Sequence, residues 1–256
     1  QGLQNSVSQW LSHTETGINY AQAVSSGSAA LKVALKTLNI KPEDEIIVPS
    51  FNFVTSAAVF ANFGAKIRFV DCNSQTLCAS LSSIKKNITK KTKAIIIMHY
   101  AGVGSEINQI KKLCKQKNIY LIEDAAQCIG SKYGNKFLGS FGDLSTFSFH
   151  ETKNINSGEG GLLAINDSRF IKRAEIIWEK GTNRTSFFKG EVNKYGWKDI
   201  GSSFLPSEII AAFLYAQLLN LDDIQNRRKY LWQKYYDFLH PISSNVGIKL
   251  PFIPDF

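Results

Sequence analysis

Residues 94–127, AIIIMHYAGVGSEINQIKKLCKQKNIYLIEDAAQ, contain the pattern that decides the fold. Two short apolar runs, at 94–99 and 119–124, flank a helical pattern at 107–117. Both runs are apolar on both faces, which is typical of parallel strands buried between two layers of helices. The segment therefore predicts two parallel strands joined by a crossover helix.

The same alternation extends in both directions along the chain. Further strand-like segments lie at 45–49, 66–71, 144–149 and 161–166, and further helix-like segments at 28–38, 54–63, 80–87 and 168–180. Alternation of this kind predicts an α/β fold with a mainly parallel central sheet that helices cover on both faces.

Beyond the last of these segments the pattern changes. Residues 182–206, TNRTSFFKGEVNKYGWKDIGSSFLP, are polar and aromatic-rich, and we expect this long loop to cover a site or a subunit contact. A helical pattern follows Pro206, which suits the first turn of a helix, and Pro241 is expected to end it. We place the domain boundary inside this pattern, with a large domain at 1–225 and, at 226–256, a linker helix and the start of a second domain.

The composition narrows the class of protein. Of the 256 residues, 44% are hydrophobic and 20% are charged, which is typical of a folded, water-soluble chain. No apolar run reaches the roughly 18 residues that a membrane-spanning helix requires. The four cysteines form no CxxC pair, which predicts free thiols in a reducing cytoplasm, and no metal site is predicted.

The formal net charge of +9 favours anionic partners. Much of the excess lies in lysine clusters at 85–93 and 111–117, whose spacing is typical of solvent-exposed helix faces and turns. Because no aromatic residues are interleaved with these lysines and no nucleic-acid-binding module is present, we do not expect nucleic acid to be the partner.

Polar or aromatic residues follow several predicted strands, where ligands bind in open α/β sheets. Asp124 ends an apolar strand, and a carboxylate there is costly unless a cation pairs with it. Gln127 follows it, His99 and Tyr100 end another strand, and Phe51 and Phe53 follow a third. Two alternatives remain open: both phenylalanines could lie in the core, and His99 could be a structural histidine. Upstream, Ser26, Gly27 and Ser28 begin a helix whose free amides suit a phosphate, although serine and glycine are also ordinary helix caps.

The most informative stretch is TFSFHETKNINSGEGG at 146–161 with its flanking strands, and it contains Ser148, His150 and Lys153. An isolated lysine is usually a solvated surface group. In a dry pocket, however, desolvation lowers the pKa of a lysine and makes it a usable amine nucleophile. A phosphate cradle, an aromatic ring, a buried aspartate and a strand-end lysine are together what pyridoxal 5′-phosphate requires.

At these residues the chain resembles the DegT/DnrJ/EryC1/StrS family of pyridoxal-phosphate-dependent sugar aminotransferases, which have the large domain of fold type I. The resemblance covers nearly the whole chain. Its motifs, in the order and spacing of the family, are SGSAAL, VPSFNFV, GAKIRFVD, HYAG, IEDAAQ, GDLSTFSFHETKN and GEGG.

The resemblance implies a role for each matching residue. Lys153 would bind the cofactor covalently and move the proton, and Asp124 would pair with the pyridine nitrogen. Gln127 would contact the phenolic oxygen, and Phe53 would stack on the ring. The phosphate would be held by Gly27, Ser28 and Ser148. Candidates for contacts with the substrate or a partner subunit are His150, Glu151, Asn183, Arg184 and Lys189.

The resemblance also implies a nucleotide-linked keto sugar as substrate and an amino-acid donor, L-glutamate by preference. The motif HETKN and the stretch that follows residue 178 are most similar to transaminases that form dTDP-4-amino-4,6-dideoxygalactose for enterobacterial common antigen or O-antigen type polysaccharides. Three alternatives remain: an aminotransferase for another sugar or carbon, such as a perosamine-type enzyme, a dehydratase, and a non-catalytic relative. Dehydratases of this fold carry histidine in place of Lys153, and retention of Lys153, Asp124 and Gln127 argues against a binding protein.

Members of the family form homodimers with shared active sites, so a homodimer is implied. Many members have an asparagine, before the helix that follows Pro206, that reaches the partner's cofactor. This chain has Ser203 and Phe204 there, so that contact is not implied. Relatives also carry an N-terminal arm and a C-terminal domain of roughly a hundred residues. We therefore expect a small C-terminal domain that is largely missing from this sequence, which also lacks an initiator Met and a leader pattern.

Overall fold

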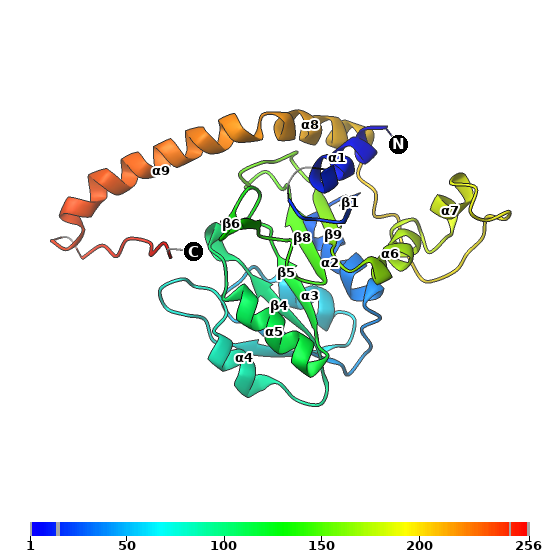
Figure 1. The fold of residues 1–256 in the computed structure, drawn as a ribbon, viewed down its shortest axis with the longest axis horizontal. Coiled ribbons are helices and arrows are strands. Elements are labelled where there is room, and N and C mark those ends of the chain that lie inside the picture. The colour runs from blue at the N-terminus through cyan, green and yellow to red at the C-terminus, as the bar shows by residue number, and fades with distance from the viewer. Residues whose placement is uncertain (1, 14–15, 246, 255–256) are drawn as a thin grey trace.

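The computed structural model describes residues 2–13, 16–245 and 247–254. Within these residues a seven-stranded sheet forms the centre of the molecule (Figure 1). In spatial order its strands are β1 (Tyr20–Val24), β9 (Gly161–Ile165), β8 (Leu144–Ser148), β5 (Tyr120–Asp124), β4 (Thr92–Met98), β2 (Glu45–Pro49) and β3 (Lys66–Val70). The five strands from β8 to β3 are parallel, whereas β9 is antiparallel to both β8 and β1.

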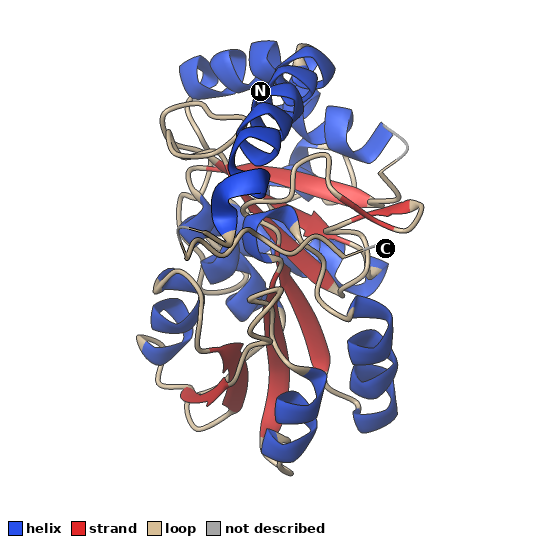
Figure 2. Ribbon diagram, turned by 90° about the vertical axis from the view of Figure 1, so that its left-hand side faces the viewer, coloured by secondary structure: helices blue, strands red, loops and turns tan. Residues whose placement is uncertain are grey.

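Helices cover both faces of this sheet, so the strands lie between two helical layers (Figure 2). One layer contains α2 (Gly27–Thr37), α3 (Thr55–Ala61) and α6 (Ile171–Trp178). The other contains α1 (Gly2–His13), α4 (Leu81–Asn87), α5 (Ile107–Lys117) and α8 (Glu208–Leu219). In β4, Ile95 and Ile97 pack into the second layer and Ala94 and Ile96 into the first, because successive side chains point to opposite faces.

The predicted α/β class, the mainly parallel sheet and the helices on both faces are confirmed. All six predicted strands form within one or two residues of their expected bounds. The pattern missed α1, the edge strand β1, and a small hairpin of β6 (Lys132–Tyr133) and β7 (Lys136–Phe137). The four cysteines are free, as expected.

The loop at 182–206 is more ordered than its composition suggests. It contains the short helix α7 (Arg184–Phe188) and isolated bridges that join Glu179 to Ser203 and Thr182 to Trp197. The loop therefore folds largely upon itself beside α6 (Figure 1).

The long helical pattern near the end of the chain forms two helices, because it breaks at Asn220. Ser207 caps α8 by accepting a hydrogen bond from Ile210 N, so Pro206 precedes the cap instead of lying in the first turn. The second helix, α9 (Leu221–Ser243), continues past Pro241, so the expected stop at this proline is wrong. A proline is tolerated here because the exposed end of the helix leaves the freed carbonyl open to water.

The first turns of α9 pack against the body. Leu221 and Ile224 contact the core, and Gln225 Nε2 donates a hydrogen bond to Ile129 O at 2.7 Å. No α9 residue is buried, and the helix extends beyond the sheet (Figure 1). The division into a domain at 1–225 and a segment at 226–256 stays a prediction. No helix in the described part of the chain is long and apolar enough to cross a membrane.

Candidate active site

A cleft of about 830 Å³ opens at the carboxyl ends of the parallel strands. Met98, Asp124 and Ser148, the last residues of β4, β5 and β8, all lie in its wall. Of the residues predicted for the site, the cleft brings together Gly27, Ser28, Phe53, Asp124, Gln127, Ser148, His150 and Lys153. The cleft therefore gathers strand-end side chains that lie far apart in the sequence.

Asp124 is the most buried acid in the cleft, with 5% of its surface exposed. Ser56 Oγ donates a hydrogen bond to Asp124 Oδ2 at 2.5 Å, and Ala126 N donates one to Oδ1 at 3.2 Å. Burial raises the pKa of the Asp124 carboxyl, and these two hydrogen bonds oppose the shift only partly. Because no lysine, arginine or histidine among the described residues forms an ion pair with it, Asp124 can still pair with a cationic group of a ligand.

The start of α2 forms a cradle of backbone amides. Ser26 caps the helix, and its Oγ accepts a hydrogen bond from Ala29 N at 3.1 Å. Gly27 packs so closely on Ser148 that a Cβ atom at Gly27 would lie 2.9 Å from Ser148 Cβ. The free amides of a helix N-terminus and a serine hydroxyl together suit a phosphate group.

Gly161, the first residue of β9, supports the same cradle. A Cβ atom there would overlap the carbonyl group of Ser26 and lie 2.6 Å from Gly27 N. The cradle can therefore approach β9 only because residue 161 has no side chain.

We expect Gly161→Ala to lower the free energy of unfolding by about 1–3 kcal/mol, because the backbone of the cradle must move to admit the methyl group. The change is measured by thermal unfolding, as a decrease in Tm of about 2–4 °C per kcal/mol. Gly196→Ala is the matched control, since a Cβ atom there meets nothing within 4 Å and should change stability by less than about 0.5 kcal/mol. Equal melting temperatures for the two variants would contradict the packing argument.

Lys153 lies in the turn between β8 and β9, where its backbone N donates a hydrogen bond to His150 O at 2.9 Å. Its side chain is half-buried in the cleft wall, so the dry pocket expected for it is not closed by this chain alone. Phe53 is 66% exposed at the rim, with its ring available to a planar ligand. Phe51 instead packs on Tyr100, with ring centroids 4.8 Å apart, and does not line the cleft.

Gln127 is already engaged by the protein. Its Oε1 accepts a hydrogen bond of 2.5 Å from Ala101 N, in the short helix η1 (Tyr100–Gly102). Ala101 has φ of 52°, in the left-handed region, so this turn is strained where it meets Gln127.

The substrate candidates divide into two groups. His150 and Glu159 both line the cleft, and His150 Nε2 lies 3.7 Å from Glu159 Oε1. Glu151 is exposed and outside the cleft wall, although its backbone N bonds Gly158 O in the same turn.

The other candidates lie outside this cleft. Asn183 is buried, donates a hydrogen bond to Lys194 O and accepts one from Gly196 N. Arg184 pairs with Glu179, and Lys189 pairs with Glu175. Within this chain the polar groups of Asn183 and Arg184 therefore hold the 182–206 loop and not the cleft, and their contacts with a substrate or a partner subunit stay predictions.

Several residues of the cleft were not predicted. Among them are Ser25, Thr55, Ser56, Thr146, Thr152 and Glu159. Thr55 and Ser56 directly follow the VPSFNFV motif, which contains Phe53, and this motif is the one sequence signal that could have indicated them. Phe204 O accepts a hydrogen bond from Ser25 N at 2.8 Å. Phe204, which lies where many family members have an asparagine, therefore supports the segment that leads into the cradle.

The sequence profile of the DegT/DnrJ/EryC1/StrS aminotransferase family matches residues 13–253. A GDP-perosamine synthase of Escherichia coli O157:H7 is 39% identical over 216 residues, which are 83% of this chain and 56% of that protein. A dTDP-4-dehydro-2,3,6-trideoxy-D-glucose 4-aminotransferase of Saccharopolyspora spinosa is 32% identical over 92% of this chain and 62% of that protein.

A solved structure of a Streptococcus pneumoniae protein described as a sugar aminotransferase, in its PLP form, superposes with a TM-score of 0.84. It is 25% identical to this chain, over 93% of this chain and 64% of its own. The chain thus spans less than two thirds of the length of each of these three proteins.

Proposed function

We propose that this chain, which belongs to the DegT/DnrJ/EryC1/StrS aminotransferase family, forms the cofactor-binding part of a pyridoxal-phosphate-dependent sugar aminotransferase. The observation that carries the proposal is one cleft that holds a buried aspartate, a lysine and a phosphate cradle. A non-catalytic relative would not need to retain this combination.

The residues of the cleft suit the chemical groups of pyridoxal phosphate. The amides at Gly27 and Ser28, with the Ser148 hydroxyl, would hold the phosphate, and Phe53 would stack on the ring. Asp124 has only neutral hydrogen-bond donors, so a protonated ring nitrogen would supply its missing cation.

Two residues carry out the chemistry in this proposal. When bound, pyridoxal phosphate supplies an electron-withdrawing ring that stabilises negative charge on the reacting carbon. Asp124 would hold the proton on the ring nitrogen, and Lys153 would hold the cofactor and, as a free amine, would move the proton of the reacting carbon. The cleft walls orient both groups toward the same space.

The substrate we propose is dTDP-4-keto-6-deoxy-D-glucose, with L-glutamate as donor and dTDP-4-amino-4,6-dideoxy-D-galactose as product. Support comes from the HETKN motif at 150–154 and from the stretch that follows residue 178. The net charge of +9 suits a pyrophosphate-linked sugar. The product would enter surface polysaccharide synthesis of the enterobacterial common antigen or O-antigen type, in the cytoplasm.

A second candidate is a GDP-linked 4-keto-6-deoxyhexose. The observation that favours it is the 39% identity to a GDP-perosamine synthase.

The two candidates predict different nucleotide preferences. The purified protein is supplied with pyridoxal phosphate, L-glutamate and each keto sugar in turn, and amino-sugar formation is followed by mass spectrometry. We expect kcat/KM for the dTDP sugar to exceed that for the GDP sugar by about tenfold or more, since a mismatched nucleotide leaves polar groups unpaired. Preference for the GDP sugar would reject the narrow proposal, and turnover of no keto sugar would reject the class.

We also propose a homodimer. On α8, Leu214 and Leu218 are buried in the core, whereas Ile209 and Phe213 are 82% and 55% exposed on the outer face. A helix that is apolar all round is normally buried, so a second copy would cover this face.

A further inference from the structure

Glu123 is a completely buried acid to which neither the sequence nor the proposed chemistry gives a role. It precedes Asp124 at the end of β5, and alternation along the strand points the two carboxylates to opposite faces of the sheet. Asp124 therefore faces the cleft, and Glu123 points to the opposite face of the sheet.

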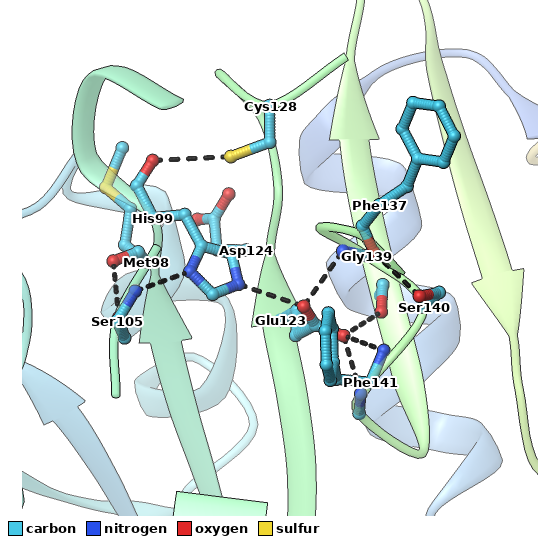
Figure 3. Close-up of polar contacts among 12 residues, drawn as sticks. Met98, His99, Ser105, Glu123, Asp124, Cys128, Phe137, Gly139, Ser140 and Phe141 are labelled. Atoms are coloured by element: carbon cyan, nitrogen blue, oxygen red, sulfur yellow. Dashed lines mark hydrogen bonds and ion pairs between the residues drawn. The ribbon is translucent and has the colours of Figure 1, made fainter. Parts of the chain in front are cut away.

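The Glu123 carboxylate anchors the loop that leads into β8. Its Oε1 accepts hydrogen bonds from Phe141 N at 2.7 Å and Gly142 N at 2.5 Å, and its Oε2 accepts one from Gly139 N at 2.8 Å (Figure 3). Ser145 Oγ adds a longer bond of 3.2 Å. Because this loop leads directly into β8, the same carboxylate helps to set the position of the strand that ends in the cleft.

The same carboxylate also fixes one histidine. His99 is fully buried, and its Nε2 lies 2.9 Å from Glu123 Oε2. Its Nδ1 accepts a hydrogen bond from Ser105 N at 3.0 Å, so Nδ1 carries no proton and Nε2–H is the donor to Glu123. Burial alone would raise the pKa of Glu123, but the hydrogen bonds from His99 and the loop amides lower it, so the carboxylate stays charged.

His99 connects Glu123 to the cleft. Its backbone N donates a hydrogen bond to Asp124 O, and its carbonyl accepts one from Gly102 N, both at 3.3 Å. The turn that starts at His99 presents Ala101 N to Gln127 Oε1. A change in the His99 ring would therefore move the two neighbours of the proposed ring site, Asp124 and Gln127.

We infer that Glu123 is a positioning residue for the cofactor site, acting through His99 on Asp124 and Gln127 and through the 139–142 loop on Ser148. The inference rests on the proposed cofactor function. It assigns Glu123 no contact with cofactor or substrate.

A purely structural role would make Glu123 no different from other buried acids that stabilise the fold. Glu45 provides the comparison, because it is 8% exposed and accepts hydrogen bonds from Arg68 Nε at 2.8 Å and Thr89 Oγ1 at 2.5 Å. Glu45 begins β2, so it lies at the amino edge of the parallel strands, opposite the cleft.

Glu123→Gln should weaken pyridoxal phosphate binding, and Glu45→Gln should not. A glutamine amide at residue 123 directs N–H groups at the His99 or loop donors, which leaves a buried donor unpaired. We expect the Kd, measured from the Lys153-dependent absorption band, to rise by about tenfold or more. A wild-type Kd for Glu123→Gln, or an equal rise for both variants, would overturn the inference.

Two substitutions of His99 test the connection separately and remain decisive should Glu123→Gln fail to fold. His99→Gln keeps an N–H donor at the position of Nε2, whereas His99→Asn keeps only an acceptor for Ser105 N. We expect pyridoxal phosphate to bind about tenfold or more tightly to His99→Gln than to His99→Asn, with thermal unfolding as the check on folding. Equal affinities, or tighter binding by His99→Asn, would refute the role of the Glu123 bond.

Hydrogen exchange of the protein without cofactor distinguishes this inference from the proposed function. In Glu123→Gln, amides at 99–105 and 139–142 should exchange faster than in wild type, and Glu45→Gln should leave both segments unchanged. If the wild-type protein gives no Lys153-dependent absorption band with pyridoxal phosphate, the proposed function fails. Faster exchange of these two segments in Glu123→Gln would still support the positioning role of Glu123. Unchanged exchange in both segments would refute it.

Discussion

Replacing Lys153 with alanine is expected to abolish the visible absorption band of bound pyridoxal phosphate and to lower kcat by about 10³-fold or more. The side chain lies in the turn that follows β8 and lines the cleft that Asp124 and Ser148 share. No other lysine lines this cleft among the described residues, so no second amine can take its place. Absorption spectra and amino-sugar formation measure the two effects.

The control for this substitution is Lys85→Ala. Lys85 is exposed on α4, outside the cleft wall, so its loss changes the net charge equally without touching the site. It should leave both the spectrum and the turnover of the wild type. A band of wild-type intensity in Lys153→Ala would refute the assignment of the lysine and, with it, the aminotransferase chemistry.

Some of this site could be predicted because its physical signals are local. Asp124 follows the apolar run of β5, where an uncompensated carboxylate has a high free-energy cost. Because the carboxyl ends of parallel strands share an edge, predicting the strands also predicted that Asp124 and Ser148 would lie in one cleft. Their positions at the strand ends could be predicted without knowledge of their side-chain partners.

Other features could not be predicted because they depend on distant partners. Ser56 lies in the first turn of α3, where a serine is ordinary, and it meets Asp124 across 68 residues. The segment YAQAV at 20–24 has weak strand propensity, and it forms β1 because β9 offers it a free edge. Such pairings belong to the tertiary structure.

The loop at 182–206 illustrates a different difficulty. An asparagine that binds a ligand and one that binds its own backbone have the same sequence signature. Asn183 belongs to the second kind in this structure, since both ends of its amide bond the loop. Any contact of Arg184 with a substrate would require it to leave Glu179 or to act across a subunit interface.

Asp124→Asn is expected to leave pyridoxal phosphate bound to Lys153 but to lower kcat by about 10²–10³-fold. An asparagine amide has nearly the same shape as the carboxylate but no charge, so it cannot hold a proton on the ring nitrogen. Asn Oδ1 can accept the bond from Ala126 N while the NH₂ group donates to Ser56 Oγ, because a hydroxyl can also accept a hydrogen bond. Turnover and absorption spectra of the same sample separate chemistry from binding.

Ser56→Ala distinguishes the charge of Asp124 from its placement. This substitution removes the 2.5 Å hydrogen bond but keeps the carboxylate. Burial raises the pKa of the Asp124 carboxyl, and the hydrogen bond from Ser56 opposes this rise only partly. Loss of one hydrogen bond to a charged group should lower kcat by about tenfold, well short of the effect of Asp124→Asn. Unchanged turnover in Asp124→Asn would remove Asp124 from the chemistry. Equal losses in both variants would mean that the position of the carboxylate, rather than its charge, governs the reaction.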